Sequence, residues 1–166
     1  SSSPFTDVGA RLWVHVARSM SFSEDILEEA CEVVSHLSLP EEALDATLLE
    51  AWYDEDEKSV HVRATGDGLI CARLRAGGWG VVRLRFPSDA PRYLSYDLNL
   101  ARRTEYFRQF GGTQIVELWL DGVHQVSEEV RIEHKDENLA PFEKIFQAAD
   151  FDLILVCSDG FESFRR

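Results

Sequence analysis

The sequence predicts an α+β fold in which helices pack on a sheet of antiparallel strands. Two amphipathic helical segments, at about 8–20 and 21–37, precede a run of strands between 46 and 86, and these strands are joined by links of only a few residues. Links this short favour antiparallel neighbours, because parallel strands need a crossover of a dozen or more residues. With 166 residues, 45% of them hydrophobic, the chain can bury a core and is predicted to be a single domain over 1–166.

The two helices are predicted from apolar residues at helical spacing and from their caps. The first carries an apolar face from Val8 to Met20, and Thr6 or Asp7 can cap it. The second starts at the capping box that Ser21 and Glu24 form. Its buried stripe consists of Ile26, Ala30, Val33, Val34 and Leu37. Because the strands follow these helices directly, we expect the helices to cover a sheet face.

The remaining elements follow from alternation and from turn residues. Strands are expected at 46–53, 60–65, 69–74 and 80–86, as one antiparallel meander. A helix is expected at 98–110, ended by Gly111-Gly112, and a hairpin at 114–120 and 123–132 around Asp121-Gly122. A short helix at 141–148 precedes the last strand, and 161–166 can begin another helix.

Charge and cysteine content exclude several classes of partner. The net charge of −13 repels nucleic-acid backbones and anionic lipid, so neither a nucleic acid nor a membrane is expected as partner. No apolar run approaches the roughly 20 residues that span a bilayer, and the N-terminus lacks a signal-peptide pattern. Cys31, Cys71 and Cys157 lack metal-binding spacing and are expected to be reduced core residues of a cytoplasmic protein. The sequence does not define an oligomeric state.

Some charged segments are expected to be solvated surface. The acidic run 54–58 is predicted to form a hairpin turn, because it lacks the glycine and the later glutamate of a calcium-binding EF-hand loop. His61 alternates with valines in a strand and is expected to face solvent. Arg102 and Arg103 are expected on a solvated helix face rather than at a phosphate.

Two carboxylates stand at the ends of predicted strands. The apolar segment 153–157 runs directly into Ser158-Asp159-Gly160, and Asp67 lies in Gly66-Asp67-Gly68 between two strands. A carboxylate at a rigid strand end offers the oxygen ligands that Mg²⁺ and Mn²⁺ prefer. The alternative for each is an aspartate-glycine turn that closes an ordinary core strand.

The order of these motifs resembles the PP2C or PPM family of metal-dependent serine/threonine protein phosphatases, in its bacterial form. That family has a strand with Ala-Thr, here Ala46-Thr47, a strand ending in Gly-Asp-Ser, here Gly66-Asp67-Gly68, and a late strand ending in Ser-Asp-Gly, here at 158–160. The resemblance implies an α-β-β-α sandwich of two antiparallel sheets flanked by helices. It also implies a hydrolase that removes phosphate from phosphoserine or phosphothreonine in a phosphoprotein substrate.

The resemblance also assigns the metal ligands. Two or more Mn²⁺ or Mg²⁺ ions would share a bridging water that attacks phosphorus, so no side chain is expected to be the nucleophile. Asp159 matches a ligand of the binuclear centre, and Asp67 matches a ligand of a further metal nearby. We therefore expect the carboxyl groups of Asp67 and Asp159 to converge at one edge of the sandwich.

Several family features are absent from this sequence. Gly68 replaces the serine of Gly-Asp-Ser, and the early aspartate, the phosphate-binding arginine, the Asp-Gly strand end and the final Asp-Asn are not present. The segment 1–11 resembles the loop that follows the missing Asp-Gly, so the chain is expected to be an interior portion of a phosphatase domain, incomplete at both ends. Two alternatives remain: a catalytically inactive PP2C-like module with a binding or regulatory role, and a structural metal-binding domain.

Overall fold

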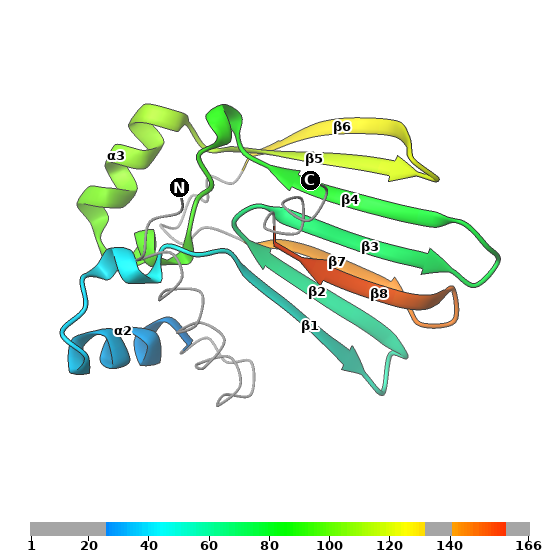
Figure 1. Ribbon diagram of the computed structural model, residues 1–166, viewed down its shortest axis with the longest axis horizontal. Coiled ribbons are helices and arrows are strands. Elements are labelled where there is room, and N and C mark those ends of the chain that lie inside the picture. Colours follow the sequence, from blue (N-terminus) through cyan, green and yellow to red (C-terminus); the bar gives the residue numbers. More distant parts are fainter. Residues whose placement is uncertain (1–25, 132–140, 159–166) are drawn as a thin grey trace, which may run out of the picture.

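The computed structural model describes residues 26–131 and 141–158, which form two antiparallel sheets with helices at one end (Figure 1). One sheet has three strands in the order β1-β2-β7, and the other has five in the order β6-β5-β4-β3-β8. The predicted α+β class and the two antiparallel sheets are confirmed. The strands are β1 (Leu48–Asp54), β2 (Ser59–Thr65), β3 (Gly68–Leu74), β4 (Trp79–Arg85), β5 (Thr113–Leu120), β6 (Val123–Arg131), β7 (Phe142–Gln147) and β8 (Phe151–Cys157).

The two sheets face each other across a shared apolar core. Val62 of β2, Ile70 of β3 and Phe146 of β7 are all buried in it. The rings of Phe146 and Phe151 meet edge to face with their centroids 5.3 Å apart. Because these residues come from both sheets, the fold is a sandwich and not two separate sheets.

The predicted single meander over 46–86 is wrong between the second and third strands. The hairpin of β1 and β2 belongs to the three-stranded sheet, whereas the hairpin of β3 and β4 belongs to the five-stranded sheet. The chain crosses from one sheet to the other at Gly66, whose φ of 107° a residue with a side chain rarely adopts. A short link shows that two strands are close, but it does not distinguish a hairpin from a crossing between sheets.

The predicted helix at 141–148 is also wrong, because this segment is strand β7. It pairs with β2 in antiparallel register, with Phe146 opposite Val60. The sequence signal was ambiguous, since Phe142 and Phe146 are four residues apart and share a face in a helix as well as in a strand. Both contact the apolar core between the sheets, and the free edge of β2 supplies backbone partners.

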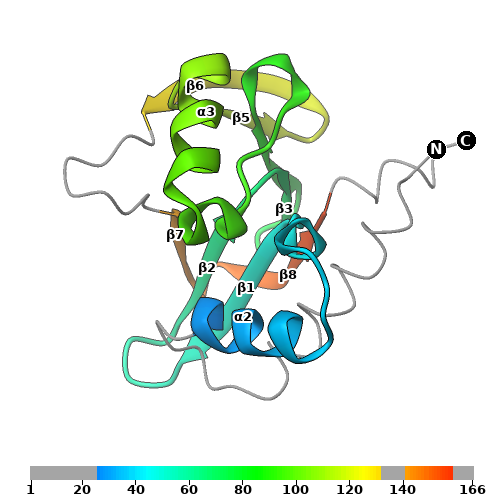
Figure 2. The same cartoon turned by 90° about the vertical axis from the view of Figure 1, so that its left-hand side faces the viewer.

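Helices α2 (Ile26–His36) and α3 (Leu100–Phe110) confirm two predicted helices but not their expected position. Both lie at one end of the sandwich, and Figure 2 shows them in front of the strand ends and not across a sheet face. Three short 3₁₀ helices accompany them: η1 (Glu41–Leu44), η2 (Pro87–Asp89) and η3 (Leu94–Leu98). Ile26, Ala30 and Val34 of α2 pack against Leu44, Ala46 and Leu48, the segment that enters β1. Leu37, also expected in the buried stripe, lies just beyond the helix and is 55% exposed.

Ion pairs join α3 to the segments before it, so the expectation that Arg102 and Arg103 lie on a solvated face is wrong. Arg102 places one guanidinium nitrogen 3.0 and 2.7 Å from the two carboxylate oxygens of Asp45. Ser95 donates to the same carboxylate at 2.6 Å. Arg103 lies 3.9 Å from Asp97, which also binds the buried Arg92. These contacts fix the end of the sandwich where the candidate site lies.

Tyr106 of α3 is predicted to titrate at unusually high pH. Its buried hydroxyl donates to the carbonyl of Ala90 at 2.8 Å, and burial, followed by Tyr96, raises the pKa of Tyr106 from 10 to about 12. Because the folded pKa exceeds the unfolded one, the stability that this group contributes is complete below pH 10 and is lost as the pH rises through about 12. In a pH titration followed by the ultraviolet absorbance of tyrosinate, the wild type should show a final ionisation step at high pH, and Tyr106→Phe should lack it. Loss of that step together with unchanged stability would contradict the hydrogen bond, which should contribute about 1 kcal/mol.

Several sequence predictions lie outside the described residues, namely the helices at 8–20 and 161–166 and the capping box of Ser21 and Glu24. The three cysteines are described, and all are free and half-buried. None of the helices in the described ranges combines the length and the apolar character that a membrane crossing requires.

Candidate functional site

Asp67 lies at the crossing between the sheets, where neighbouring residues fix its position. The hydroxyl of Thr47 donates to the Oδ1 atom of Asp67 at 2.9 Å, and so connects the start of β1 to this turn. The buried side chain of Gln114 donates to the carbonyl of Gly66 at 3.3 Å. Thr47 therefore holds the carboxylate of Asp67, and Gln114 holds the backbone of the residue before it, at the beginning of β3.

The glycines on both sides of Asp67 allow close approach of other backbone segments. A Cβ atom at position 66 would lie 2.7 Å from Oγ1 and 3.0 Å from Cα of Thr47. A Cβ atom at position 68 would lie 2.8 Å from the carbonyl oxygen of Cys157. The glycine at position 68 thus permits β8 to pass close beside β3.

Strand register brings the end of β8 next to the start of β3. Leu69 pairs with Cys157 and Ile70 with Val156 in an antiparallel ladder. In the sequence, Asp67 comes two positions before Leu69, and Asp159 comes two positions after Cys157. Asp159 itself lies outside the described residues, so its predicted convergence with Asp67 remains a prediction.

A polar cavity of about 320 Å³ opens beside Asp67. Its charged lining consists of Asp67, Arg83, Arg85 and Asp89, and Tyr93 contributes a phenol. Neither arginine was expected at this site from the sequence. The signal that could have found them is their alternation along a strand that neighbours the Gly-Asp-Gly turn, which places both on one face of β4.

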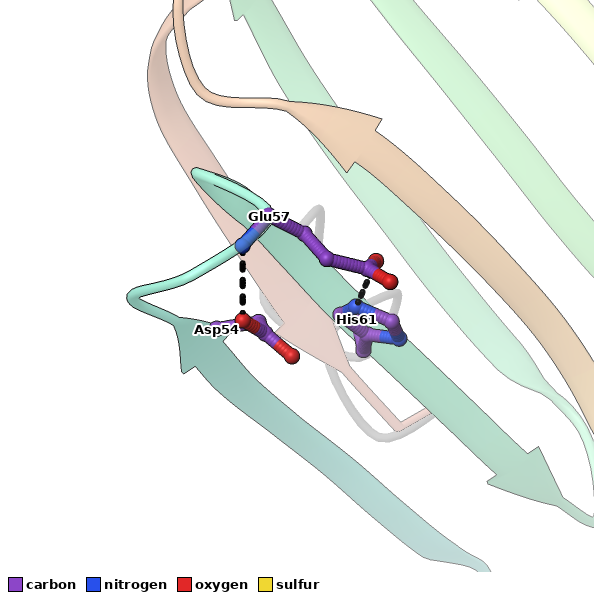
Figure 3. Close-up of side chains that lie close together, drawn as sticks. All are labelled: Asp54, Glu57 and His61. Carbon is purple, nitrogen blue, oxygen red and sulfur yellow. Dashed lines mark hydrogen bonds and ion pairs between the residues drawn. The ribbon is translucent and has the colours of Figure 1, made fainter.

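A second group of potential metal ligands lies at the turn between β1 and β2 (Figure 3). Asp54, Glu57 and His61 place one ligand atom each within 4.8 Å of one another. From the sequence, the acidic run 54–58 is expected to be a solvated turn and His61 is expected to face solvent. The hairpin turn is confirmed, but His61 is half-buried, stacks on Trp52 with ring centroids 5.2 Å apart and lies 3.4 Å from Glu57.

Local turn structure accounts for this second group without a ligand. The Asp54 carboxylate accepts the backbone N–H groups of Glu57 and Asp56, both at 2.9 Å. The hydrogen bond from the backbone N–H of Glu57 is the largest cause of the lowered pKa of Asp54; desolvation opposes it, and the hydrogen bond from Asp56 lowers the pKa further. Such a side-chain cap is usual for an aspartate that begins a turn.

An apolar groove of about 500 Å³ lies between β7 and the inner face of the five-stranded sheet. It exists because the three-stranded sheet covers only part of the larger one. Val126 and Val130 of β6 point toward this space and remain 40% and 41% exposed. Glu128, Glu143 and Lys144 lie at this groove, and Asp67 is not among the residues that line it.

Comparison with known proteins found no relative: no protein-family model, no curated protein and no solved structure matches this chain.

Proposed function

We propose that this chain belongs to a PP2C-like, metal-dependent phosphatase that hydrolyses phosphoserine or phosphothreonine in phosphoproteins. The observation that carries the proposal is the place of Asp67, held by Thr47 at the start of β3, directly beside the strand end that leads to Asp159. The two antiparallel sheets that face each other match the sheet part of the architecture that the resemblance implies, whereas the two described helices lie at one end of the sandwich and not on its outer faces (Figure 2).

The surroundings of Asp67 fit a divalent metal. An ionised carboxylate has about four acceptor positions, so the hydrogen bond from Thr47 to one oxygen is compatible with metal ligation by the group. Hydrogen bonds of this kind usually orient carboxylates that bind metals. Asp67 and Asp159 would hold the metal through oxygen atoms, the donors that Mn²⁺ and Mg²⁺ prefer. When bound, such an ion lowers the pKa of water and neutralises charge on a phosphate.

The open inner face of the five-stranded sheet supports the proposal that the chain is an interior portion of a longer domain. Val126 and Val130 of β6, which border the groove, keep 40% and 41% of their surface exposed. Additional strands beside β7 would extend the smaller sheet over them and bury this surface.

The proposal is tested by the release of phosphate from phosphoserine and phosphothreonine peptides, with the longest natural chain that contains these residues. We expect hydrolysis that requires Mn²⁺ or Mg²⁺ and stops with a chelator. Asp67→Asn and Asp159→Asn should each lower the rate at least about 100-fold, and Thr47→Val about 10–100-fold through poorer orientation of Asp67.

Asp56→Asn is the matched control, because Asp56 is an exposed aspartate on the hairpin between β1 and β2. It should leave the rate unchanged. A folded, full-length protein without metal-dependent hydrolysis would reject the phosphatase and favour the inactive binding module.

A further inference from the structure

We propose that Arg83 and Arg85 form a subsite for the phosphate group of a phosphate monoester, next to the carboxylate of Asp67. The subsite deepens the proposed phosphatase function and rests on it for the role of the metal. Both arginines line the cavity that Asp67 borders.

The spacing of the two arginines suits a single tetrahedral anion. They occupy alternate positions of β4 and so project from the same face of the sheet, with Cα atoms about 7 Å apart. Long side chains at this separation can bring both guanidinium groups to one phosphate. Guanidinium groups bind phosphate oxygens through paired, charge-assisted hydrogen bonds, and they keep their charge at all physiological pH values.

The existing partners of Arg85 are weak enough for a phosphate to replace one of them. Arg85 lies 3.4 Å from Asp89, whose side chain is 87% exposed, and 3.8 Å from Glu117. An exposed pair of this kind contributes about 0–1 kcal/mol. A phosphate dianion can therefore displace Asp89 from the guanidinium group, whereas the largely buried Glu117 stays as a fixed partner behind it.

The charges in and beside the cavity explain why a metal and a phosphate should bind together. Arg83, Arg85, Asp67 and Asp89 line the cavity, and Glu117 lies beside Arg85, so two positive groups meet three carboxylates and the site without metal is slightly negative. A divalent ion at Asp67 reverses that balance. We therefore expect phosphate to bind weakly in a chelator and more tightly with Mg²⁺.

Calorimetric titration of the full chain with inorganic phosphate, in Mg²⁺ and in a chelator, tests the subsite. Arg83→Gln and Arg85→Gln should each weaken binding at least about tenfold, since a hydrogen bond to a charged group contributes about 1.5–3 kcal/mol. Asp89→Asn should strengthen binding several-fold, which a misfolded variant could not do. Arg63→Gln is the matched control, because Arg63 pairs with Glu143 in the other sheet; it should change nothing.

A phosphoserine peptide and its unphosphorylated form, titrated in the chelator, identify the source of the phosphate. Tighter binding of the phosphopeptide than of inorganic phosphate assigns the subsite to a phosphorylated side chain, and equal binding assigns it to free phosphate. Equal binding of both peptides overturns the proposal, as does phosphate binding that neither arginine substitution changes, or no phosphate binding in either condition.

The same titrations separate this subsite from the phosphatase function. Asp67→Asn removes a negative charge and should strengthen phosphate binding in the chelator, while it lowers hydrolysis. If hydrolysis is absent but the arginine substitutions still weaken phosphate binding, the subsite is supported and the phosphatase function is rejected. If hydrolysis is present and the arginine variants bind phosphate normally, the subsite fails alone.

Discussion

Replacing Asp97 by alanine should lower the free energy of unfolding by about 3–5 kcal/mol, because it would leave the buried charge of Arg92 without its partner. The Arg92 side chain is 3% exposed, and one of its guanidinium nitrogens lies 2.6 Å from both carboxylate oxygens of Asp97. Burial lowers the pKa of Arg92, and the hydrogen bond that its guanidinium group donates to Asp97 opposes this shift. Urea denaturation of wild type and variant measures the loss.

Two comparisons make this prediction specific. Glu105→Ala removes the partner of Arg108 from a pair that is exposed on both sides, and it should leave the stability unchanged within error. A double replacement of Arg92 and Asp97 by leucine should recover much of the loss, because no unpaired charge then remains. If Asp97→Ala lowers the free energy of unfolding no more than Glu105→Ala does, the ion pair with Asp97 is not required to stabilise the buried Arg92.

Gly66→Ala should be the second most damaging change, and it should act on both stability and the site. A φ of 107° costs a residue with a side chain about 1–3 kcal/mol, and the contact with the backbone of Thr47 adds a penalty of similar size. Relief of that contact would move Thr47 away from Asp67. We therefore expect a loss of metal affinity in addition to a lower midpoint of denaturation.

Gly77→Ala separates the effect of backbone strain from the effect of the steric contact with Thr47. Gly77 has a similar φ of 98°, but a Cβ atom there meets nothing within 4 Å. It should show the backbone strain without the steric contact and keep metal affinity. Equal losses in the two variants would mean that the close approach to Thr47 is unimportant.

Local sequence signals predicted most elements of the fold but not their assembly. Helix α3 was predictable because Gly111 ends it, and the hairpin of β5 and β6 because Asp121-Gly122 marks its turn. Strand β7 was missed because the spacing of Phe142 and Phe146 fits two periodicities. The distribution of strands between two sheets depends on Gly66, and no local pattern distinguishes a crossing between sheets from a hairpin.

The candidate site, too, could be predicted from the sequence only in part. The Gly-Asp-Gly motif indicated Asp67, which lies between β2 and β3, and its role as a metal ligand stays a prediction. Gln114, which holds the carbonyl of Gly66, lies 48 residues away in the sequence and could not be anticipated. Arg83 and Arg85 carried a local signal, the alternation of basic residues in a strand, but only the folded chain places them beside Asp67.

Electron paramagnetic resonance of Mn²⁺ binding tests most directly whether a metal centre forms where β3 begins and β8 ends. The full-length chain should bind Mn²⁺, and Asp67→Asn and Asp159→Asn should each weaken that binding, whereas Asp54→Asn on the distant hairpin should not. Binding that survives both site substitutions but weakens in Asp54→Asn would place the metal at the group of Asp54, Glu57 and His61. That result would contradict a phosphatase centre at Asp67.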